Sequence, residues 1–195
     1  MALEYRKRGQ HHGNAREALR EAAAEMLETT GAANLSLRAI AERAGLSRQA
    51  PYNHFADKEA MLADLVVAGF DRLARDTETA SAALTGEPAL TAAGDAYIAF
   101  AQSAPALFRL MFSCERIDQV RFPEVAEAGN RSFNVLRTIV ATIAATDRVE
   151  DASLAAWCLV HGYATLCIET KLEPSARRSE RALQFARLIV SSSMI

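Results

Sequence analysis

Residues 36–58 read SLRAIAERAGLSRQAPYNHFADK and predict two short helices joined by a turn. Ser36 can cap the start of the first helix, whose apolar positions follow at helical spacing: Leu37, Ile40, Ala41 and Ala44. Gly45 can adopt the left-handed conformation that ends a helix. Ser47 then offers a second cap, so we expect a second helix to begin there.

The second helix is unusually rich in long hydrogen-bonding side chains, namely Arg48, Gln49, Tyr52, Asn53 and His54. Arg, Gln and Asn can each bond two atoms of a base edge, whereas Tyr, His and backbone N–H groups more often hold phosphate. A helix, a turn with glycine and a polar helix form the helix-turn-helix pattern of DNA-binding proteins. A pair of solvated surface helices would also explain the caps, but it would not explain the joint spacing.

The run SLRAIAERAGLSRQAPYNHFADKEAML resembles the DNA-binding domain of the TetR family of transcriptional regulators. The matching positions are Ile40, Ala41, Ala44, Gly45, Ser47, Tyr52, His54, Phe55 and Lys58. The chain departs from the family at Pro51, where a small or aliphatic residue is usual. Because Pro51 falls in the first turn or just beyond it, we expect the second helix to persist with a slightly altered start.

Charge is distributed unevenly, although the formal net charge is only −2. Residues 1–58 carry nine Lys and Arg against seven Asp and Glu, whereas residues 59–195 carry thirteen against seventeen. We assign base reading to Arg48, Gln49 and Asn53, and phosphate contact to Ser36, Arg38, Ser47, Tyr52, His54 and Lys58. Residues 1–13 form a flexible basic arm that could reach phosphates or the minor groove, although a merely solvated terminus would look the same.

The composition is that of a globular protein of one or two domains, with half of its 195 residues apolar. The longest apolar stretch, residues 154–168, is interrupted by His161 and is too short to span a bilayer. No apolar run follows the N-terminal charges, so no secretory signal is indicated and we expect a cytoplasmic protein without membrane contact. Three cysteines at irregular spacing fit reduced thiols, and we expect Cys158 and Cys167 to be buried as small hydrophobes.

Helical periodicity along the chain predicts an all-α protein with about nine helices. Asn14 and Glu17 resemble a capping box at the start of the first one. The expected helices cover 14–31, 36–44, a short stretch from 47, 57–83, 89–104, a short stretch from 105, 123–145, 152–172, and a last one through Leu183, Ala186, Ile189 and Val190. This count also resembles the TetR family. We therefore divide the chain into the arm 1–13, a DNA-binding domain 14–58 and a larger C-terminal domain 59–195, bridged by the helix 57–83.

Trp157, His161 and Gly162, in AAWCLVHGYATL, resemble the signature of one TetR C-terminal domain type, called WHG. Trp157 and His161 lie four apart, so they share a helical face. With other aromatic and Met side chains they could line an apolar ligand pocket: Tyr97, Phe100, Phe108, Met111, Phe112 and Phe133. Packing in an ordinary core would explain the same residues. Gly162 costs about 1 kcal/mol relative to Ala within a helix, which suggests close approach of a backbone or ring there.

Enzyme signatures are missing from the sequence, which contains no glycine-rich phosphate loop, nucleophile elbow or His-Glu-x-x-His motif. Cys158 and His161 could face one metal ion, but the spacing places no third ligand, so we expect no metal and no cofactor. An enzyme using these two residues stays open only as a rival interpretation.

The resemblance implies a ligand-responsive transcriptional regulator, most often a repressor, that a small-molecule effector releases from a palindromic DNA operator. One short helix reads few base pairs, so we expect a homodimer with two half-sites about 34 Å or a multiple apart. The resemblance places the dimer contact in the last two helices. An activator on the same scaffold, or a helical protein-binding module without DNA binding, are the alternatives.

Overall fold

The computed structural model describes residues 15–113 and 117–169. Within these ranges the chain is all α, as predicted, but it forms seven α-helices rather than about nine. The second helix of the helix-turn-helix is a short 3-10 helix, and the predicted last helix lies outside the described residues. The arm 1–13 and Asn14 also lie outside them.

The N-terminal lobe contains α1 (Ala15–Asn34), α2 (Leu37–Arg43) and the 3-10 helix η1 (Ala50–Asn53). The α1 backbone leaves the helical conformation at Gly31, at the predicted end of the first helix, with φ of +75°. Ser36 caps α2, because its hydroxyl accepts the Ala39 N–H at 3.2 Å. Gly45 ends α2 in the left-handed region, with φ of +68°. The sequence signals at both ends of α2 are therefore confirmed.

Pro51 explains why η1 is not the α-helix that the sequence predicts. An α-helix capped by Ser47 would need an N–H at residue 51, and proline has none. The Ser47 carbonyl instead accepts the Ala50 N–H at 3.0 Å, and the Gln49 carbonyl accepts the Tyr52 N–H at 3.1 Å. Both bonds have the three-residue spacing of a 3-10 helix. The proline thus changes the helix type and not only its start.

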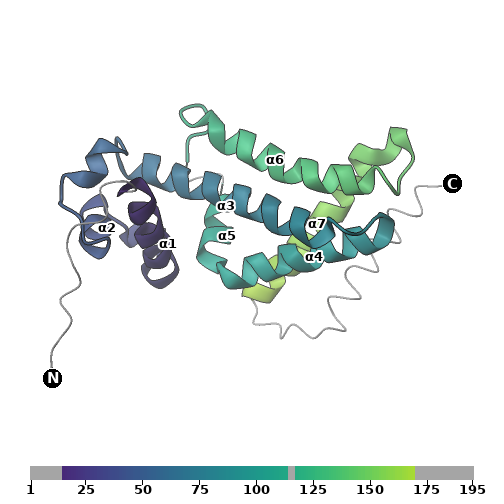
Figure 1. Ribbon diagram of the computed structural model, residues 1–195, viewed down its shortest axis with the longest axis horizontal. Helices are drawn as coiled ribbons and strands as arrows, with labels where there is room; N and C mark the ends of the chain where they lie inside the picture. The colour runs from purple at the N-terminus through teal and green to yellow at the C-terminus, as the bar shows by residue number, and fades with distance from the viewer. Residues whose placement is uncertain (1–14, 114–116, 170–195) are drawn as a thin grey trace, which may run out of the picture.

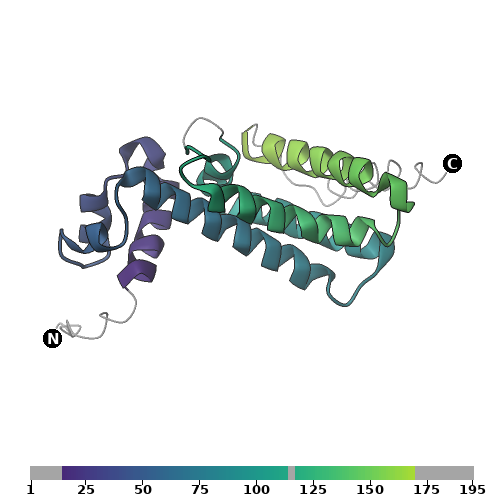
Figure 2. The ribbon, with the colours of Figure 1, turned by 90° about the horizontal axis from the view of Figure 1, so that it is seen from above.

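The lobe is joined to the rest of the molecule by α3 (Lys58–Ser81). This helix follows directly on Asp57, where the sequence predicts its start. The Asp57 carboxylate caps it by accepting the Ala60 N–H at 2.9 Å. Beyond the lobe, α3 packs between α4 (Gly86–Ser103) and α6 (Pro123–Val140), and α7 (Val149–Glu169) closes the bundle against both (Figures 1 and 2). The short α5 (Pro105–Met111) contacts α1 and α3, at the end of the bundle nearest the lobe (Figure 1).

Three predicted boundaries in the bundle are wrong. The helix predicted at 89–104 already begins at Gly86, whose φ is +63°. The helix predicted to reach 145 ends at Val140, and the helix predicted from 152 begins at Val149, after a 3-10 helix η2 (Thr146–Arg148). Thr142 links the end of α6 to the start of α4. Its hydroxyl donates to the Ile139 carbonyl at 2.7 Å and accepts the Gly86 N–H at 3.2 Å. A contact between residues so far apart in sequence has no local signal.

One hydrophobic core continues from the lobe into the bundle. It includes Leu19 and Ile40 in the lobe, Met61 and Leu65 on α3, and Phe100 on α4, all nearly inaccessible to solvent. The two parts of the molecule are therefore packed against each other rather than loosely tethered. Among the described helices, none combines the length and the apolar character needed to cross a membrane.

Candidate functional site

The residues predicted to contact DNA lie together on the surface of the lobe. All of them are exposed except Lys58, which is half-buried: Ser36, Arg38, Ser47, Arg48, Gln49, Tyr52, Asn53 and His54. Tyr52 is one of the large side chains that the structure leaves exposed, at 54%. The geometry is that of a polar surface carried by η1 and the start of α2.

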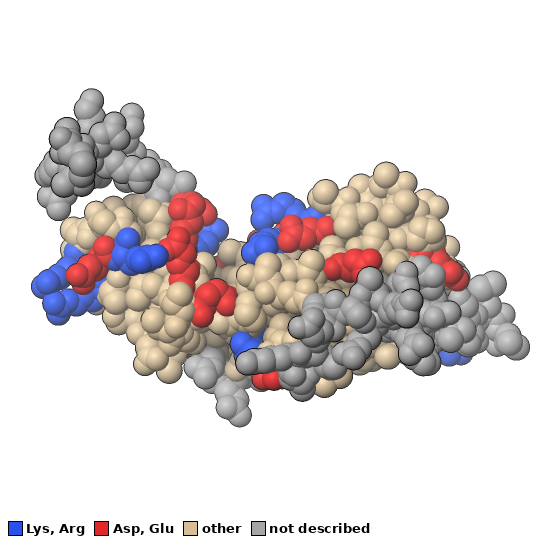
Figure 3. All heavy atoms as spheres, turned by 90° about the horizontal axis from the view of Figure 1, so that it is seen from below, with Lys and Arg blue, Asp and Glu red and all other residues tan. Residues whose placement is uncertain are grey.

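Two predicted phosphate contacts already have intramolecular roles. The Ser36 hydroxyl caps α2, and the Lys58 ammonium donates to the Ala33 carbonyl at 2.8 Å. Lysine has three N–H donors, so Lys58 keeps capacity for a phosphate. Basic side chains at this end of the molecule are interspersed with acidic ones (Figure 3), as in the ion pair between Arg43 and Glu25 at 2.7 Å. The surface thus combines polar groups with modest charge.

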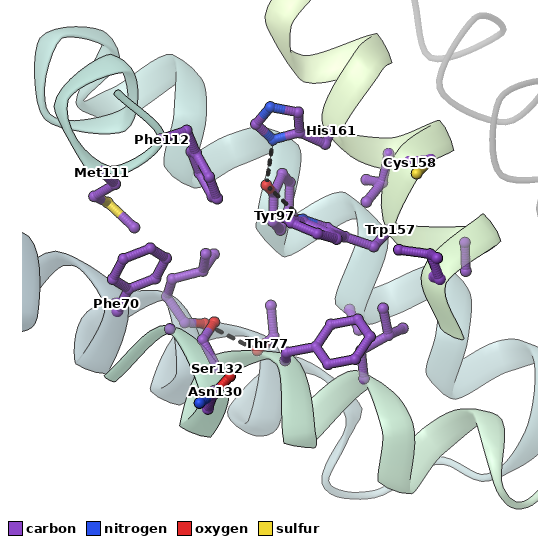
Figure 4. A pocket seen from close by; sticks show the side chains of 18 of the residues that line it. Phe70, Thr77, Tyr97, Met111, Phe112, Asn130, Ser132, Trp157, Cys158 and His161 are labelled. Atoms are coloured by element: carbon purple, nitrogen blue, oxygen red, sulfur yellow. Dashed lines mark hydrogen bonds between the residues drawn. The ribbon is translucent and has the colours of Figure 1, made fainter. Parts of the chain in front are cut away.

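A cavity of about 680 Å³ lies inside the bundle, between α3, α4, α6 and α7 (Figure 4). Six of the eight predicted ligand-binding residues line it: Tyr97, Met111, Phe112, Phe133, Trp157 and His161. Phe100 and Phe108 do not. The Arg72 guanidinium covers the Phe100 ring at 5.1 Å, and Phe108 stacks on the His161 ring with centroids 5.2 Å apart. Phe108 therefore packs against the lining residue His161 without lining the cavity itself.

Three of the lining side chains form a hydrogen-bonded cluster. The Tyr97 oxygen lies 2.8 Å from Nδ1 of His161 and accepts the Trp157 N–H at 3.3 Å (Figure 4). Burial lowers the pKa of His161 because the imidazolium form loses hydration, so the ring is neutral near pH 7. Burial likewise raises the pKa of Tyr97, which keeps its proton. The cluster is polar but uncharged.

Other lining residues were missed by the sequence analysis as cavity residues. Phe70 and Thr77 project from α3, and Asn130 and Ser132 from α6 (Figure 4). The helix 57–83 was expected from its apolar spacing, but such spacing does not distinguish packing against a neighbour from lining a cavity. Only the packed structure separates these possibilities.

Two sequence expectations on α7 are wrong. Among the described residues, nothing lies within 4 Å of a Cβ atom placed at Gly162, so no described backbone or ring approaches it. Cys158 is exposed, whereas Cys167 is buried as predicted. Cys158 is both exposed and one of the residues that line the cavity, whereas Gly162 is exposed and does not line it. The apolar composition of this helix hid the difference between its faces.

A salt-bridged contact joins the cavity wall to the start of α3. Arg121 forms ion pairs with Asp57 and Glu59, and its Nη1 atom lies 2.7 Å from the Glu59 carboxylate. Glu59 also accepts the Asp118 N–H at 2.9 Å. The hydrogen bond from Arg121 lowers the pKa of Asp57, the cap of α3. Since Ile117 and Gln119 line the cavity, the segment 117–122 touches both the cavity and the lobe junction.

Family comparisons agree with this arrangement. The family model described as "Tetracyclin repressor-like, C-terminal domain" matches residues 90–190, just over half of the chain. The model described as "Bacterial regulatory proteins, tetR family" matches residues 19–65, which include the helix-turn-helix. The chain belongs to the TetR family. It is accordingly a DNA-binding transcriptional regulator and not an enzyme.

Several solved structures share the TetR fold of this chain. A protein of unknown function from Rhodococcus sp. RHA1 is 28% identical with a TM-score of 0.77, over 95% of this chain and 98% of that one. A tetR family regulatory protein from Rhodococcus RHA1 is 19% identical with a TM-score of 0.69, over 91% and 97%. FadR from Bacillus subtilis, solved in complex with stearoyl-CoA, is 16% identical with a TM-score of 0.74, over 92% and 100%. No curated protein matches the sequence.

Proposed function

We propose that this TetR family protein is a homodimeric repressor that binds a palindromic operator and is released from it by a small molecule. One observation carries the proposal. The single helix α3 joins an exposed polar helix-turn-helix surface to a bundle that contains an apolar cavity. The DNA-binding domain is residues 14–58, and residues 59–195 form the domain for effector binding and dimerisation. An activator on the same scaffold is the alternative.

In the DNA complex, Arg48, Gln49 and Asn53 read base edges. The groups holding phosphates are Ser36, Arg38, Ser47, Tyr52, His54 and Lys58. The exposure of this surface supports the assignment. A four-residue 3-10 helix presents fewer side chains to the groove than a full recognition helix, so the two half-sites of a dimer are needed for specificity.

The dimer contact uses an apolar stripe on α7. Leu154, Cys158, Gly162 and Leu166 follow one another at four-residue spacing, and Leu154 and Leu166 are 50% and 49% exposed. Large exposed apolar residues in a row indicate a protein interface, and a two-fold axis pairs the stripe with its own copy. The last helix, expected to share this contact, lies outside the described residues.

The effector acts by favouring a packing of the bundle in which α3 tilts the DNA-binding lobe. Two contacts link the lobe to elements beside the cavity. Arg121 holds the first turn of α3, and the Glu28 carboxylate on α1 accepts the N–H groups of Ala106 and Leu107 at the start of α5, both at 2.9 Å. The effector must bind the two packings unequally, and such coupling is typically ~1–3 kcal/mol.

Selection of DNA from a random pool tests the regulator proposal. The purified full-length protein is incubated with the pool at low salt, and Arg48→Ala and Gln49→Ala variants are run in parallel. We expect an enriched palindrome, with preference relaxed at defined positions in each variant. No enrichment would overturn the proposal in favour of a protein-binding module, for which binding would depend little on salt. Transcription in vitro from the enriched site then separates repression from activation.

A further inference from the structure

The charges around the cavity limit what it can bind. Among the described lining residues, no Lys or Arg is present and the only carboxylate is that of Glu150. Glu150 is at the rim, where its side chain is 70% exposed and pairs with the Arg137 guanidinium at 3.0 Å. An anionic group moved into this cavity would lose its hydration, and the described lining residues would supply no cationic side chain in return. On these residues, carboxylates and phosphates are disfavoured.

An organic cation is also a poor match, although aromatic rings surround the space. Phe112, Phe133 and Trp157 could contact a quaternary ammonium through their ring faces. However, Glu150 is already paired with Arg137, and the neutral cluster of Tyr97 and His161 supplies no negative charge. An uncharged occupant is the one that the described lining residues favour.

In the deep part of the cavity, two buried polar side chains can meet such an occupant, Thr77 and Tyr97, each 8% exposed. The Thr77 hydroxyl donates to the backbone of its own helix, at 2.9 Å from the carbonyls of both Leu73 and Ala74. Its proton is therefore engaged. Tyr97 is different, because its hydroxyl belongs to a cluster in which the position of the proton can change.

A phenol has one proton and two acceptor positions. Trp157 occupies one acceptor position of Tyr97, since an indole N–H only donates. If the Tyr97 hydroxyl donates to Nδ1 of His161, its second acceptor position is open to a ligand hydroxyl. If His161 carries its proton on Nδ1 and donates to Tyr97, the phenol proton is open to a ligand carbonyl. Either neutral tautomer leaves one hydrogen bond for an uncharged oxygen.

We propose that the effector is an uncharged, largely apolar small molecule with a carbonyl or hydroxyl oxygen, bound to the hydroxyl of Tyr97 in this cavity. The inference rests on the proposed function in taking the cavity as the effector site. The cavity volume of about 680 Å³ suits such a molecule, since small-molecule sites range over roughly 300–1,000 Å³. His161 and Trp157 are positioning residues that hold the Tyr97 hydroxyl.

The fluorescence of Trp157 offers a direct test, because it is the only tryptophan of the chain. The full-length protein is titrated with four probes that share one alkyl chain length: 2-decanone, 2-decanol, decanoate and decyltrimethylammonium. We expect saturable binding of the ketone or the alcohol at least about tenfold tighter than that of either ion. Equal or tighter binding of an ion, or no saturable binding of any probe, overturns the proposal.

Tyr97→Phe tests the hydrogen bond. It keeps the ring, which packs edge-on against Phe108 at 5.7 Å, and removes the hydroxyl. We expect the neutral probe to bind roughly three- to tenfold more weakly, the effect of losing one neutral hydrogen bond. The matched control is Tyr163→Phe, on the same helix as Trp157 but outside the lining, where affinity should be unchanged. Unchanged affinity in a folded Tyr97→Phe protein contradicts the assigned hydroxyl, and the four-probe comparison decides the ligand class if this variant does not fold.

Nitrogen-15 NMR of His161 tests the hydrogen bond to a bound ketone. A ketone oxygen only accepts, so a bound ketone should place the His161 proton on Nδ1, whereas an alcohol both donates and accepts and fits either tautomer. Failure of this inference is distinguishable from failure of the regulator proposal. An enriched operator without preference for neutral probes overturns only the ligand class, whereas saturable ketone binding without any enriched DNA overturns only the regulator.

Discussion

At the scale of single residues, His161 makes the stability of the protein depend on pH. Burial lowers its pKa below the ordinary value of 6.5, so in acid the unfolded chain binds more protons than the folded one. The free energy of unfolding should therefore be constant above about pH 6.5 with respect to this group and fall between that pH and the lowered pKa.

Urea unfolding at pH 7.5 and pH 5.5 measures this dependence. We expect His161→Gln to lose less stability on acidification than the unsubstituted protein, because the group that takes up the proton is gone. His54→Gln removes an exposed histidine far from the cavity and should keep the full loss. An equal loss in all three proteins would show that His161 does not supply the pH dependence.

Arg38 and Lys58 allow the phosphate assignments to be separated. Each phosphate contact contributes about −0.9 to the slope of log affinity against log salt concentration. Arg38→Ala and Lys58→Ala each remove one contact from both subunits of the dimer, so each should make the slope shallower by about 1.8, with binding weakened on all sequences alike. Arg75→Ala, an exposed site far along α3, serves as the control. An unchanged slope for either variant removes that residue from the phosphate contacts.

At the scale of the elements, the two helical glycines Gly162 and Gly69 should respond oppositely to alanine. Among the described residues, nothing lies within 4 Å of a Cβ atom at Gly162, so alanine should gain up to ~1 kcal/mol of helix propensity. At Gly69 on α3 the added Cβ would lie 2.7 Å from the Met111 sulfur and 3.3 Å from its Cγ, so the Met111 side chain would have to shift within the core. Overpacking of this kind costs ~1–3 kcal/mol.

Urea midpoints of dilute protein measure this contrast. We expect Gly162→Ala to be the more stable of the two variants by about 1 kcal/mol or more. If α7 pairs with its copy at Gly162, the larger side chain of Gly162→Leu should weaken the dimer. Sedimentation measures this change in dimer affinity. Equal stabilities of the two alanine variants would contradict the open environment of Gly162.

The sequence predicted elements well where the signal was local. The caps at Ser36 and Asp57 and the glycine end at Gly45 are all confirmed, because each depends on atoms a few residues apart. Pro51 was recognised as a departure from the family pattern. The change to a 3-10 helix, however, depends on which N–H groups the carbonyls of Ser47 and Gln49 accept in the folded chain. The exposed side of α7 was missed because the sequence of this helix is mostly apolar on all its faces.

The cavity could be predicted only in outline for a similar reason. Spacing placed Trp157 and His161 on one face, and the structure brings them to Tyr97, sixty or more residues away. Which aromatic residues line the cavity, and which support it as Phe108 does, depends on how four helices pack. Arg121 had no signal at all, because it lies in a segment without periodicity and its partners are on α3.

At the scale of the whole molecule, the question is how the cavity communicates with the DNA-binding lobe. The segment 117–122 supplies two lining residues and, through Arg121, holds the cap and first turn of α3. An occupant that displaces Ile117 or Gln119 would therefore disturb the contacts at Asp57 and Glu59. These ion pairs are exposed and contribute little to folding stability, so the contact can serve coupling without being essential for the fold.

Arg121→Met tests this link, with Arg131→Met as its matched control. Arg131 likewise forms an ion pair with α3, from α6 to Asp71 at 2.8 Å, but further from the lobe. The coupling between effector binding and operator binding is reciprocal. It therefore equals the ratio of the 2-decanone affinities of the free and the operator-bound protein, which are both measured by Trp157 fluorescence. We expect Arg121→Met to bring this ratio towards one and Arg131→Met to leave it unchanged, with both variants folded. A preserved ratio in Arg121→Met would mean that the signal passes instead through α5 and its contact with Glu28 on α1.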